Sequence, residues 1–284
     1  MLIQQWRSQY SLNVLCRVLD VSTSAFYSWQ RRPTSSHAEQ DALLQQRIHE
    51  LHQASKGRYG APRLQADLRA EGQHVSRKRI SRLMRVAGLR AKGKRRFVRT
   101  TDSEHTCAVC PNVLNRKFAV QYANTVWASD LTFIPTQEGW LYLAVTLDLH
   151  SRAVVGYAME AQMPATLPLT ALQMAVGTRK PPPGLIHHSD RGSQYVSKIF
   201  QAELTRIGAQ GSMSRKGNCW DNSVLESFFS SLKRELLDTA PFESRTAARQ
   251  AIFEYIEVFY NRQRRHSTLA YLTPHEFERQ AQVA

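Results

Sequence analysis

Three acidic residues, Asp130, Asp190 and Glu226, occupy positions from which carboxylates could act together on a metal. Asp130 lies in the run TVWASDLTFIP at 125–135, which is otherwise mostly apolar or hydroxylic, and Asp190 ends the run GLIHHSD at 184–190. A carboxylate inside such a run is costly unless it is paired or binds a metal ion. Oxygen ligands without an obligatory histidine or thiolate favour Mg²⁺ or Mn²⁺ over zinc. Two such ions would activate a water or a 3′-hydroxyl and stabilise the leaving oxygen of an in-line phosphoryl transfer.

Glu226 lies in a stretch, 217–237, that predicts a Gly/Asn loop followed by an amphipathic helix. Asp221 or Asn222 is a suitable N-cap, because a short polar side chain can accept from the N–H groups of the first turn. Apolar residues recur at steps of three and four and predict one buried stripe: Leu225, Phe228, Phe229, Leu232 and Leu236. Glu226 lies beside this stripe and shares its face with Asn222, Ser230 and Lys233. The helix alone leaves two interpretations open, a surface ion pair and part of a site.

Alternating and β-branched residues from Phe118 onward predict the sheet that must position the two aspartates. We expect an antiparallel meander and then alternating helices and strands, with strands at 125–135, 140–152, 153–160, 184–190 and 209–214 and helices at 167–176 and 195–207. Asp130 and Asp190 would be neighbours if the first strand is central and pairs with the fourth. The fold class is therefore α/β, a mixed sheet flanked by helices. C-terminal helices are expected at 247–260 and 274–281.

Positive charge is concentrated in the first third of the chain. Residues 1–100 contain 20 Lys/Arg and 6 Asp/Glu, whereas residues 101–284 contain 18 and 17, so nearly all of the net charge of +15 lies at the N-terminal side. Eleven Lys/Arg and no acid fall between Arg77 and Arg99. This asymmetry indicates a basic module that binds a polyanion, which we expect to be nucleic acid, joined to a nearly neutral body. No apolar run reaches the ~20 residues of a membrane span and no secretory signal is evident, so we expect a cytoplasmic protein.

A helix-turn-helix is predicted at 59–89 within this basic module. Pro62 suits the first turn of one helix, Gly72 ends it, and Ser76 caps a second helix that stops at Gly88. The second helix presents a basic outer face, as a major-groove reader requires: Arg77, Lys78, Arg82 and Arg85. A helical hairpin with a solvated basic face is the alternative. A weaker helix-turn-helix pattern occurs at 11–29.

Further candidate DNA contacts lie outside the helix-turn-helix. The basic linker at 91–112 could follow phosphates through Lys92, Lys94, Arg95 and Arg96, and the basic loop at 261–273 contributes Arg262, Arg264 and Arg265. Trp220 could stack on a base or belong to the core, while Trp127, Phe133 and Trp140 are expected in the core. His105, Cys107 and Cys110 have the spacing of zinc ligands but lack an evident fourth ligand.

Three blocks, in order along the chain, carry a resemblance to a known family. They are WASDLTF at 127–133, HSDRGSQY at 188–195 and GNCWDNSVLESFFSSLK at 217–233. They resemble the signature blocks of the retroviral-integrase-like DDE transposases, and specifically the second-reading-frame products of a large family of bacterial insertion sequences. The 35 residues between Asp190 and Glu226, and Lys233 seven positions after Glu226, match that pattern. The helix-turn-helix and the ending at 260–277 extend the similarity over most of residues 57–280.

The resemblance implies a ribonuclease H-like fold with Asp130, Asp190 and Glu226 as a catalytic triad that binds two Mg²⁺ or Mn²⁺ ions. Lys233 would contact DNA near the transposon tip. The implied reaction is cleavage that frees a 3′-hydroxyl at the end of the element, followed by strand transfer into DNA. The implied partners are the terminal inverted repeats, target DNA, at least one further copy of the chain to hold paired ends, and an upstream-frame helix-turn-helix protein as partner or fusion. A bacterial, nucleoid-associated location follows.

The expected domains are an N-terminal helical region at 1–55, a helix-turn-helix domain at 56–100, a basic linker at 101–117, the catalytic core at 118–240 and a C-terminal helical extension at 241–284. No P-loop motif occurs, so no requirement for ATP is expected. Two alternatives remain. A nuclease or junction resolvase of the same fold would stop at hydrolysis, and a DNA-binding regulator would need a broken triad.

Overall fold

The computed structural model describes residues 2–31, 35–92, 109–215, 219–237 and 241–283. Three of the predicted DNA contacts, Lys94, Arg95 and Arg96, lie outside these residues, and so do His105 and Cys107 of the zinc hypothesis. No helix in the described part of the chain is both long and apolar enough to cross a bilayer.

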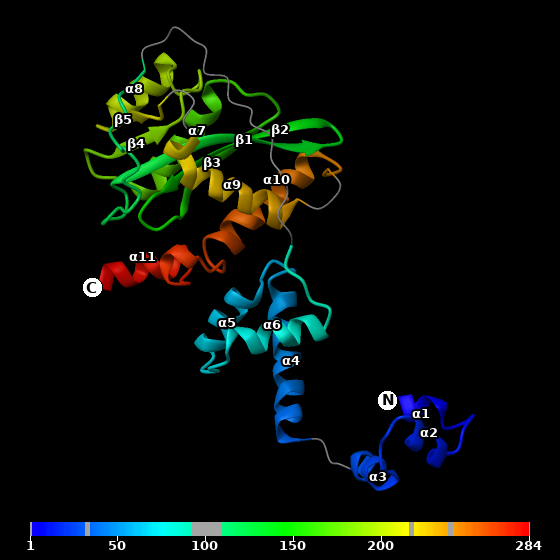
Figure 1. Ribbon diagram of the computed structural model, residues 1–284. Helices are drawn as coiled ribbons and strands as arrows, with labels where there is room; N and C mark the ends of the chain where they lie inside the picture. Colours follow the sequence, from blue (N-terminus) through cyan, green and yellow to red (C-terminus); the bar gives the residue numbers. More distant parts are fainter. Residues whose placement is uncertain (1, 32–34, 93–108, 216–218, 238–240, 284) are drawn as a thin grey trace.

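A five-stranded mixed sheet forms the centre of the upper part of the molecule in Figure 1, and the helices of the N-terminal third lie below it. Its order is β3-β2-β1-β4-β5, with β1 at Val126–Thr136, β2 at Gly139–Asp148, β3 at Val154–Glu160, β4 at Ile186–Ser189 and β5 at Gln210–Met213. β1 pairs antiparallel with β2 and parallel with β4. The predicted meander and the central position of the first strand are confirmed. The α/β class is confirmed with them.

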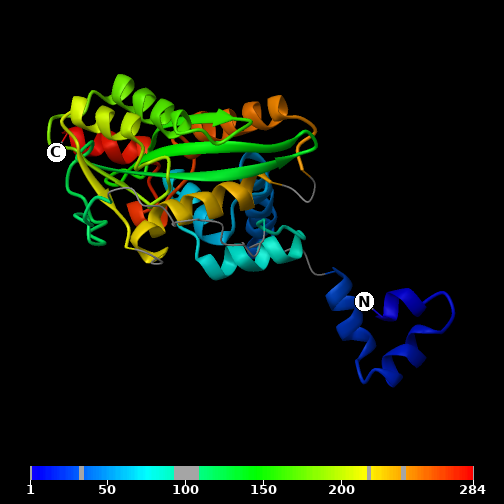
Figure 2. The same ribbon diagram turned by 90° about the horizontal axis from the view of Figure 1, so that it is seen from above.

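Helices cover both faces of this sheet. α7 (Thr166–Arg179) and α8 (Lys198–Arg206) lie on one face, and α9 (Ser223–Leu236) lies on the other (Figure 2). α7 packs against β3 at closest range beside Gly156, where an added Cβ would lie 2.2 Å from the carbonyl oxygen of Ala171. α8 begins at Lys198 rather than at Tyr195 as expected, because Ser197 forms its N-cap and accepts from the Phe200 N–H.

The C-terminal segment returns along the α9 side of the sheet. α10 (Arg245–Phe253) buries Ala248 and Ile252 in the same apolar cluster as α9, and it continues as a π-helical segment, Glu254–Tyr260. A short 3-10 turn, Ser267–Leu269, and α11 (Pro274–Val283) complete the chain.

The predicted helix-turn-helix is formed by α5 (Ala61–Ala70) and α6 (Arg77–Val86). The Ser76 side chain caps α6 by accepting from the Arg79 N–H, and Gly72 and Gly88 end the two helices with positive φ. α4 (Ser36–Ala54) packs on the pair, with apolar side chains that all three helices share: Leu44, Ile48, Leu64, Leu68, Ile80 and Leu83. These residues belong to one apolar cluster with α9 and the C-terminal segment, so the helix-turn-helix is docked on the core.

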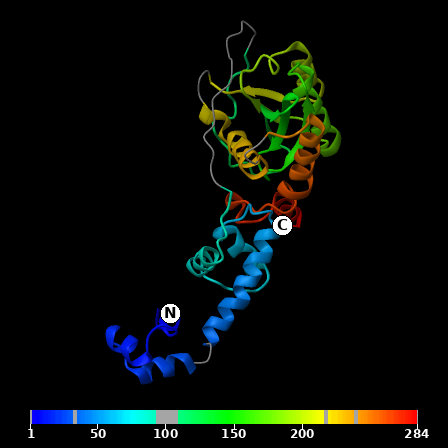
Figure 3. The same ribbon diagram turned by 90° about the vertical axis from the view of Figure 1, so that its right-hand side faces the viewer.

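The first three helices form a separate small body. α1 (Leu2–Trp6), α2 (Leu12–Val18) and α3 (Thr23–Arg31) share a core of Ile3, Cys16 and Phe26, and they lie apart from the sheet beyond the far end of α4 (Figures 1 and 3). The two short helices expected at 11–29 are confirmed.

Candidate active site

Asp130 and Asp190 are neighbours because of the register between β1 and β4. Ser129 is the partner of Ser189 in this parallel pair, so the next residue of each strand, Asp130 and Asp190, lies at the same end. Asp130 is further held by two donors: the Leu131 N–H donates to Oδ1 at 2.7 Å and Asn222 Nδ2 donates to Oδ2 at 2.9 Å. The Gly192 N–H donates to Asp190 Oδ1 at 2.9 Å.

Glu226 and Lys233 approach this pair from α9. The expected buried stripe is confirmed for Leu225, Phe228, Phe229 and Leu232. The expected capping is wrong in one respect, because Asn222 is at the N-cap position but makes no side-chain capping hydrogen bond. Its amide instead reaches Asp130. The helix is therefore fixed to β1 through the site itself.

The electrostatics of the site show how close these groups are. The pKa of Asp130 is raised well above its usual value, first by burial and then by the negative charges of Asp190 and Glu226; the Leu131 N–H and the Lys233 ammonium oppose this rise. The pKa of Lys233 is lowered by burial, and the charge of Asp130 opposes this shift. The charges of Asp190, Glu226 and Lys233 therefore all act on Asp130.

The oxygen atoms around Asp130 are the possible ligands for a divalent cation. In the described part of the chain, no three His, Cys, Asp or Glu side chains are arranged to hold a metal ion. However, two buried polar atoms beside Asp130 have no hydrogen-bond partner there: Oδ1 of Asn222 and the hydroxyl of Tyr195. Buried polar atoms are nearly always satisfied. Carboxylates that repel one another, together with unsatisfied oxygens, make a hard donor set that fits a hydrated Mg²⁺ or Mn²⁺.

Asp221 fixes the segment that leads into α9, a role that sequence reasoning missed. Its buried carboxylate accepts from Arg215 Nη2 at 2.8 Å, from Arg116 Nε at 2.7 Å and from Asn112 Nδ2 at 2.9 Å. The Arg215 side-chain hydrogen bond is the main cause of an Asp221 pKa far below its usual value. The side chain therefore joins the segment before β1, the end of β5 and the start of α9. Its position next to Asn222 in the sequence could have indicated this role.

Aromatic residues around the site differ in burial from one another. Trp127 is fully buried, as expected, whereas the expectation that Trp140 lies in the core is wrong, since it is 48% exposed. Trp140 packs edge-on against Phe133 at a centroid distance of 4.8 Å, and Lys233 Nζ lies 4.8 Å from the Phe133 centroid. Phe133 thus positions the Lys233 side chain. Trp220 is 68% exposed, so its indole is accessible beside α9.

Asp148 and the two strand-end histidines have structural partners. Asp148 is fully buried and accepts from four donors: the N–H groups of Asn124, His150 and Ser151 and the indole of Trp127. His187 is hydrogen-bonded to Ser129, and burial lowers its pKa to about 3. His188 contacts Ser212 and Ser214. These contacts give Asp148, His187 and His188 a structural role at the ends of their strands.

The predicted DNA contacts of the helix-turn-helix fall into two groups. Arg77, Lys78 and Arg85 are exposed on α6. Arg82 is also exposed but forms an ion pair with Asp41 of α4, which Arg79 contacts as well at 2.8 Å. Lys92, at the end of the described module, is partly buried.

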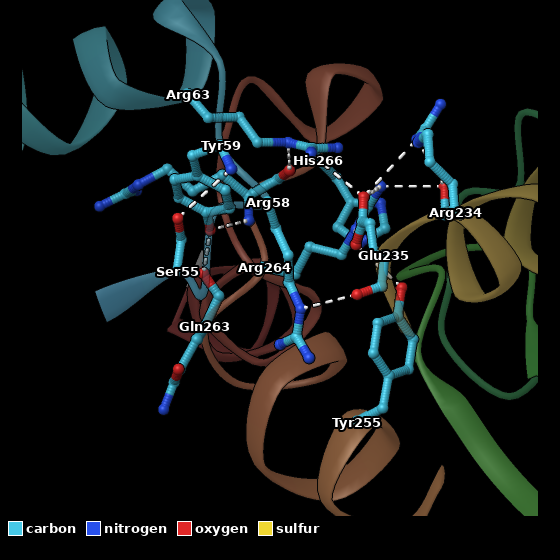
Figure 4. A network of polar contacts seen from close by, with 12 residues as sticks. Ser55, Arg58, Tyr59, Arg63, Arg234, Glu235, Tyr255, Gln263, Arg264 and His266 are labelled. Atoms are coloured by element: carbon cyan, nitrogen blue, oxygen red, sulfur yellow. Dashed lines mark hydrogen bonds and ion pairs between the residues drawn. The ribbon is translucent and has the colours of Figure 1, made fainter. Parts of the chain in front are cut away.

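The three arginines of the basic loop after the π-helical segment differ in exposure and in their partners. Arg262 is exposed, and Arg265 pairs with Asp67 of α5. Arg264 is 3% exposed and donates to Glu235 of α9 through Nε at 2.8 Å and Nη2 at 2.9 Å (Figure 4). Arg63 of α5 also reaches Glu235, at 3.3 Å. Sequence reasoning missed Glu235, although an acid on the apolar side of α9 could have marked it.

Comparison with known proteins agrees with this architecture. Two integrase core domain models match residues 121–219 and 226–281, and an HTH-like domain model matches residues 38–97. A 31 kDa protein of insertion element IS600 from Shigella sonnei is 45% identical, over 93% of this chain and 97% of its own length. The transposase InsF for insertion sequence IS3A from Escherichia coli is 44% identical, over 97% and 96%.

Two of the solved structures that match this chain are of viral proteins. The simian T-cell lymphotropic virus intasome is 17% identical, with a TM-score of 0.46 over 81% of this chain and 74% of that chain. The HTLV-2 integrase catalytic core domain in complex with magnesium is 19% identical, with a TM-score of 0.41 over 55% and 97%.

An integrase core joined to an HTH-like module defines the class: an enzyme that transfers polynucleotide strands. The 44% identity over nearly the full length of both chains narrows this class to one group. The chain belongs to the family of insertion-sequence transposases that includes InsF of IS3.

Proposed function

We propose that Asp130, Asp190 and Glu226 form the catalytic triad of this transposase, and that the enzyme cleaves DNA at the ends of its insertion sequence and joins the freed ends to DNA. The observation that carries the proposal is the parallel register of β1 and β4, which sets the two aspartates side by side under α9. The charges of Asp190 and Glu226 both act on Asp130, which supports a shared site.

Two Mg²⁺ or Mn²⁺ ions bound by the three carboxylates would supply activation of the attacking oxygen and stabilisation of the leaving oxygen. The hard oxygen donors of the three carboxylates support this choice of metal. Asn222 orients Asp130 through its amide, and Gly192 orients Asp190 through its N–H. Lys233, whose Nζ lies 4.8 Å from the Phe133 ring centre, would contact a phosphate near the transposon tip. No step requires ATP.

The exposed basic face of α6 would read the terminal inverted repeat. Arg77, Lys78 and Arg85 are directed to solvent on the second helix of the helix-turn-helix, which is the element that enters the major groove in such folds. Because two DNA ends must be held together before joining, the working enzyme contains at least two copies of the chain. An upstream-frame helix-turn-helix protein is the proposed additional partner.

Glu226→Gln tests the triad. The variant keeps the shape of the side chain and removes its charge, so we expect binding to the terminal repeats to persist while cleavage and joining with Mg²⁺ are lost. Glu203→Gln on α8, where the acid pairs only with Arg206 in the described chain, is the matched control and retains both steps. Normal strand joining by Glu226→Gln refutes the role of the glutamate. Cleavage without joining by the wild-type enzyme would favour a nuclease.

A further inference from the structure

A cavity of about 370 Å³ opens beside α9, on a different face from Glu226. Its walls come from four parts of the chain that are distant in sequence: α9, α5, the start of the β3 segment and the loop after the π-helical segment. Four arginines from these parts line it, namely Arg63, Arg152, Arg234 and Arg264. No acidic residue is among the described residues that line it.

The charges in this cavity are only partly balanced. Glu235 lies behind the wall and contacts three of the arginines, Arg264 at 2.8 Å, Arg63 at 3.3 Å and Arg234 at 3.5 Å (Figure 4). Three guanidinium groups therefore share the negative charge of one carboxylate. Arg152 is held by a neutral acceptor, the carbonyl oxygen of Phe118, at 3.1 Å. The pKa of Arg63 is lowered by burial and by the charge of Arg264, as expected for cations that lack enough counter-charge.

Hydroxyl groups complete the lining. Ser223, Ser227 and Ser231 follow one another at four-residue steps along α9, and Ser267 and Thr268 face them from the 3-10 turn. His266 also lines the cavity, and its pKa is lowered to about 3 by burial and by Arg264, so its ring is neutral at neutral pH. Guanidinium groups with hydroxyl donors are the combination that binds phosphate oxygens.

The position of the cavity relates it to the candidate active site. Ser227 follows Glu226 directly, and successive helical residues are separated by about 100°. The face formed by Ser223, Ser227 and Arg234 is therefore adjacent to the face that carries Glu226 and Lys233. A nucleic-acid strand with one phosphodiester at the carboxylates would have neighbouring phosphates within reach of this second face.

We propose that this cavity, named here the arginine pocket and formed by Arg63, Arg152, Arg234, Arg264 and the surrounding hydroxyls, binds a backbone phosphate of the DNA on which the transposase acts. The inference rests on the proposed function and adds a second phosphate site to it. The pocket joins α9 to α5 of the helix-turn-helix, so one bound phosphate would contact both the reading and the cutting parts of the enzyme.

The test is DNA binding across a range of salt concentrations with two variants of the full chain. Arg234→Gln removes one guanidinium, and Thr268→Glu places a carboxylate on the exposed opposite wall. We expect each variant to weaken DNA binding about tenfold and Arg234→Gln to lower the slope of log K against log salt by about one. The probes are a duplex with the element's terminal repeat, an unrelated duplex of equal length, and inorganic phosphate as competitor.

Arg206→Gln is the matched control, since Arg206 is a largely exposed arginine on α8 outside the pocket. A loss confined to the terminal-repeat duplex assigns the phosphate to the element's end, and a loss confined to the unrelated duplex assigns it to target DNA. If Arg234→Gln does not fold, as judged by its thermal melt, Thr268→Glu decides the question. If the folded variants keep the wild-type DNA affinity and salt slope, the proposal that the arginine pocket binds a phosphate is wrong. That result leaves the Glu226→Gln test untouched, so the two proposals fail separately.

Discussion

Asn222 donates a 2.9 Å hydrogen bond from Nδ2 to Oδ2 of Asp130, across 92 positions of sequence. The bond connects the residue before α9 to the middle of the central strand. Asn222 is 7% exposed, and its other polar atom, Oδ1, has no partner in the described part of the chain. One amide therefore both orients a carboxylate and offers an unused oxygen to the same site.

Asn222→Ala should weaken metal binding. Removal of the amide leaves Oδ2 of Asp130 without its donor, while the Leu131 N–H still holds Oδ1. Residues that hydrogen-bond to metal ligands typically contribute about 10–100-fold in affinity. Calorimetric titration of the DNA-free protein with Mn²⁺ measures the effect. Gln210→Ala, at an exposed position of β5, serves as the control with unchanged affinity. Equal affinities in the two variants would show that the amide does not support the metal site.

Arg77→Ala combined with Lys78→Ala should reduce binding to the terminal repeat and lower its salt slope by about two, one for each lost phosphate contact. Both side chains are exposed on α6. Arg79→Ala is the informative comparison, because Arg79 pairs with Asp41 of α4 and is expected to change stability more than the slope. Fluorescence anisotropy at several salt concentrations gives the slopes. If the double variant retains the wild-type slope, the reading face lies elsewhere.

Gly156→Ala should destabilise the core by about 1–3 kcal/mol, the usual cost of overpacking. The new methyl group would meet the Ala171 carbonyl oxygen at 2.2 Å and the Ala175 nitrogen at 2.7 Å, so α7 would have to move away from β3. Gly177→Ala, in α7 with nothing within 4 Å of its added Cβ, should instead stabilise by about 0.5–1 kcal/mol. Urea unfolding of both variants measures the contrast. Similar free energies of unfolding would contradict the close approach of α7.

Stability should fall in acid through Glu235. Burial acts to raise the pKa of Glu235, but the Arg264 hydrogen bonds and the charges of Arg264 and Arg63 outweigh it and bring the pKa to about 2. The folded value is below the ordinary 4.5, so this stabilisation is complete above pH 4.5 and is lost as the pH falls toward 2. Its size is about 3 kcal/mol.

Comparison of the wild-type protein with Glu235→Gln checks this linkage. The variant leaves the buried Arg264 and the partly buried Arg63 and Arg234 without their carboxylate, and it should be about 3–5 kcal/mol less stable at neutral pH. Its free energy of unfolding should also depend less on pH between 4.5 and 2 than that of the wild-type protein. Parallel pH profiles would mean that another group carries the acid sensitivity.

The sequence predicted the sheet and the approach of the two aspartates because both depend on local patterns. Alternation marked β1, β2 and β3. A motif inside the first run marked Asp130, and a motif at the end of the fourth run marked Asp190. Polar contacts between distant segments left no such pattern. Glu235 was not recognised as a partner of Arg264 and Arg63, since an ion pair across 29 or 172 positions has no periodic signature.

Two smaller predictions, at Asn222 and Trp140, were also wrong. Asn222 resembled an ordinary helix cap because capping depends only on nearby backbone, whereas its actual partner is in β1. Trp140 was expected in the core rather than in contact with a base, yet it lies at the exposed start of β2, where it packs against Phe133. The error at Asn222 was decided by a segment 92 positions away, whereas Trp140 meets its partner Phe133 within the β1–β2 hairpin.

The hydrogen bonds between Tyr59 and the segment at Gln263 and Arg265 span 204 and 206 positions, nearly three quarters of the polypeptide. Protein synthesis proceeds from the N-terminus, and early segments can fold before later ones emerge. The helices at 36–86 can therefore be made and wait on the ribosome long before their docking partners exist. Under the proposed function, a chain that stops early would carry the proposed reading helices without Glu226, so incomplete products would occupy DNA ends but leave them uncut.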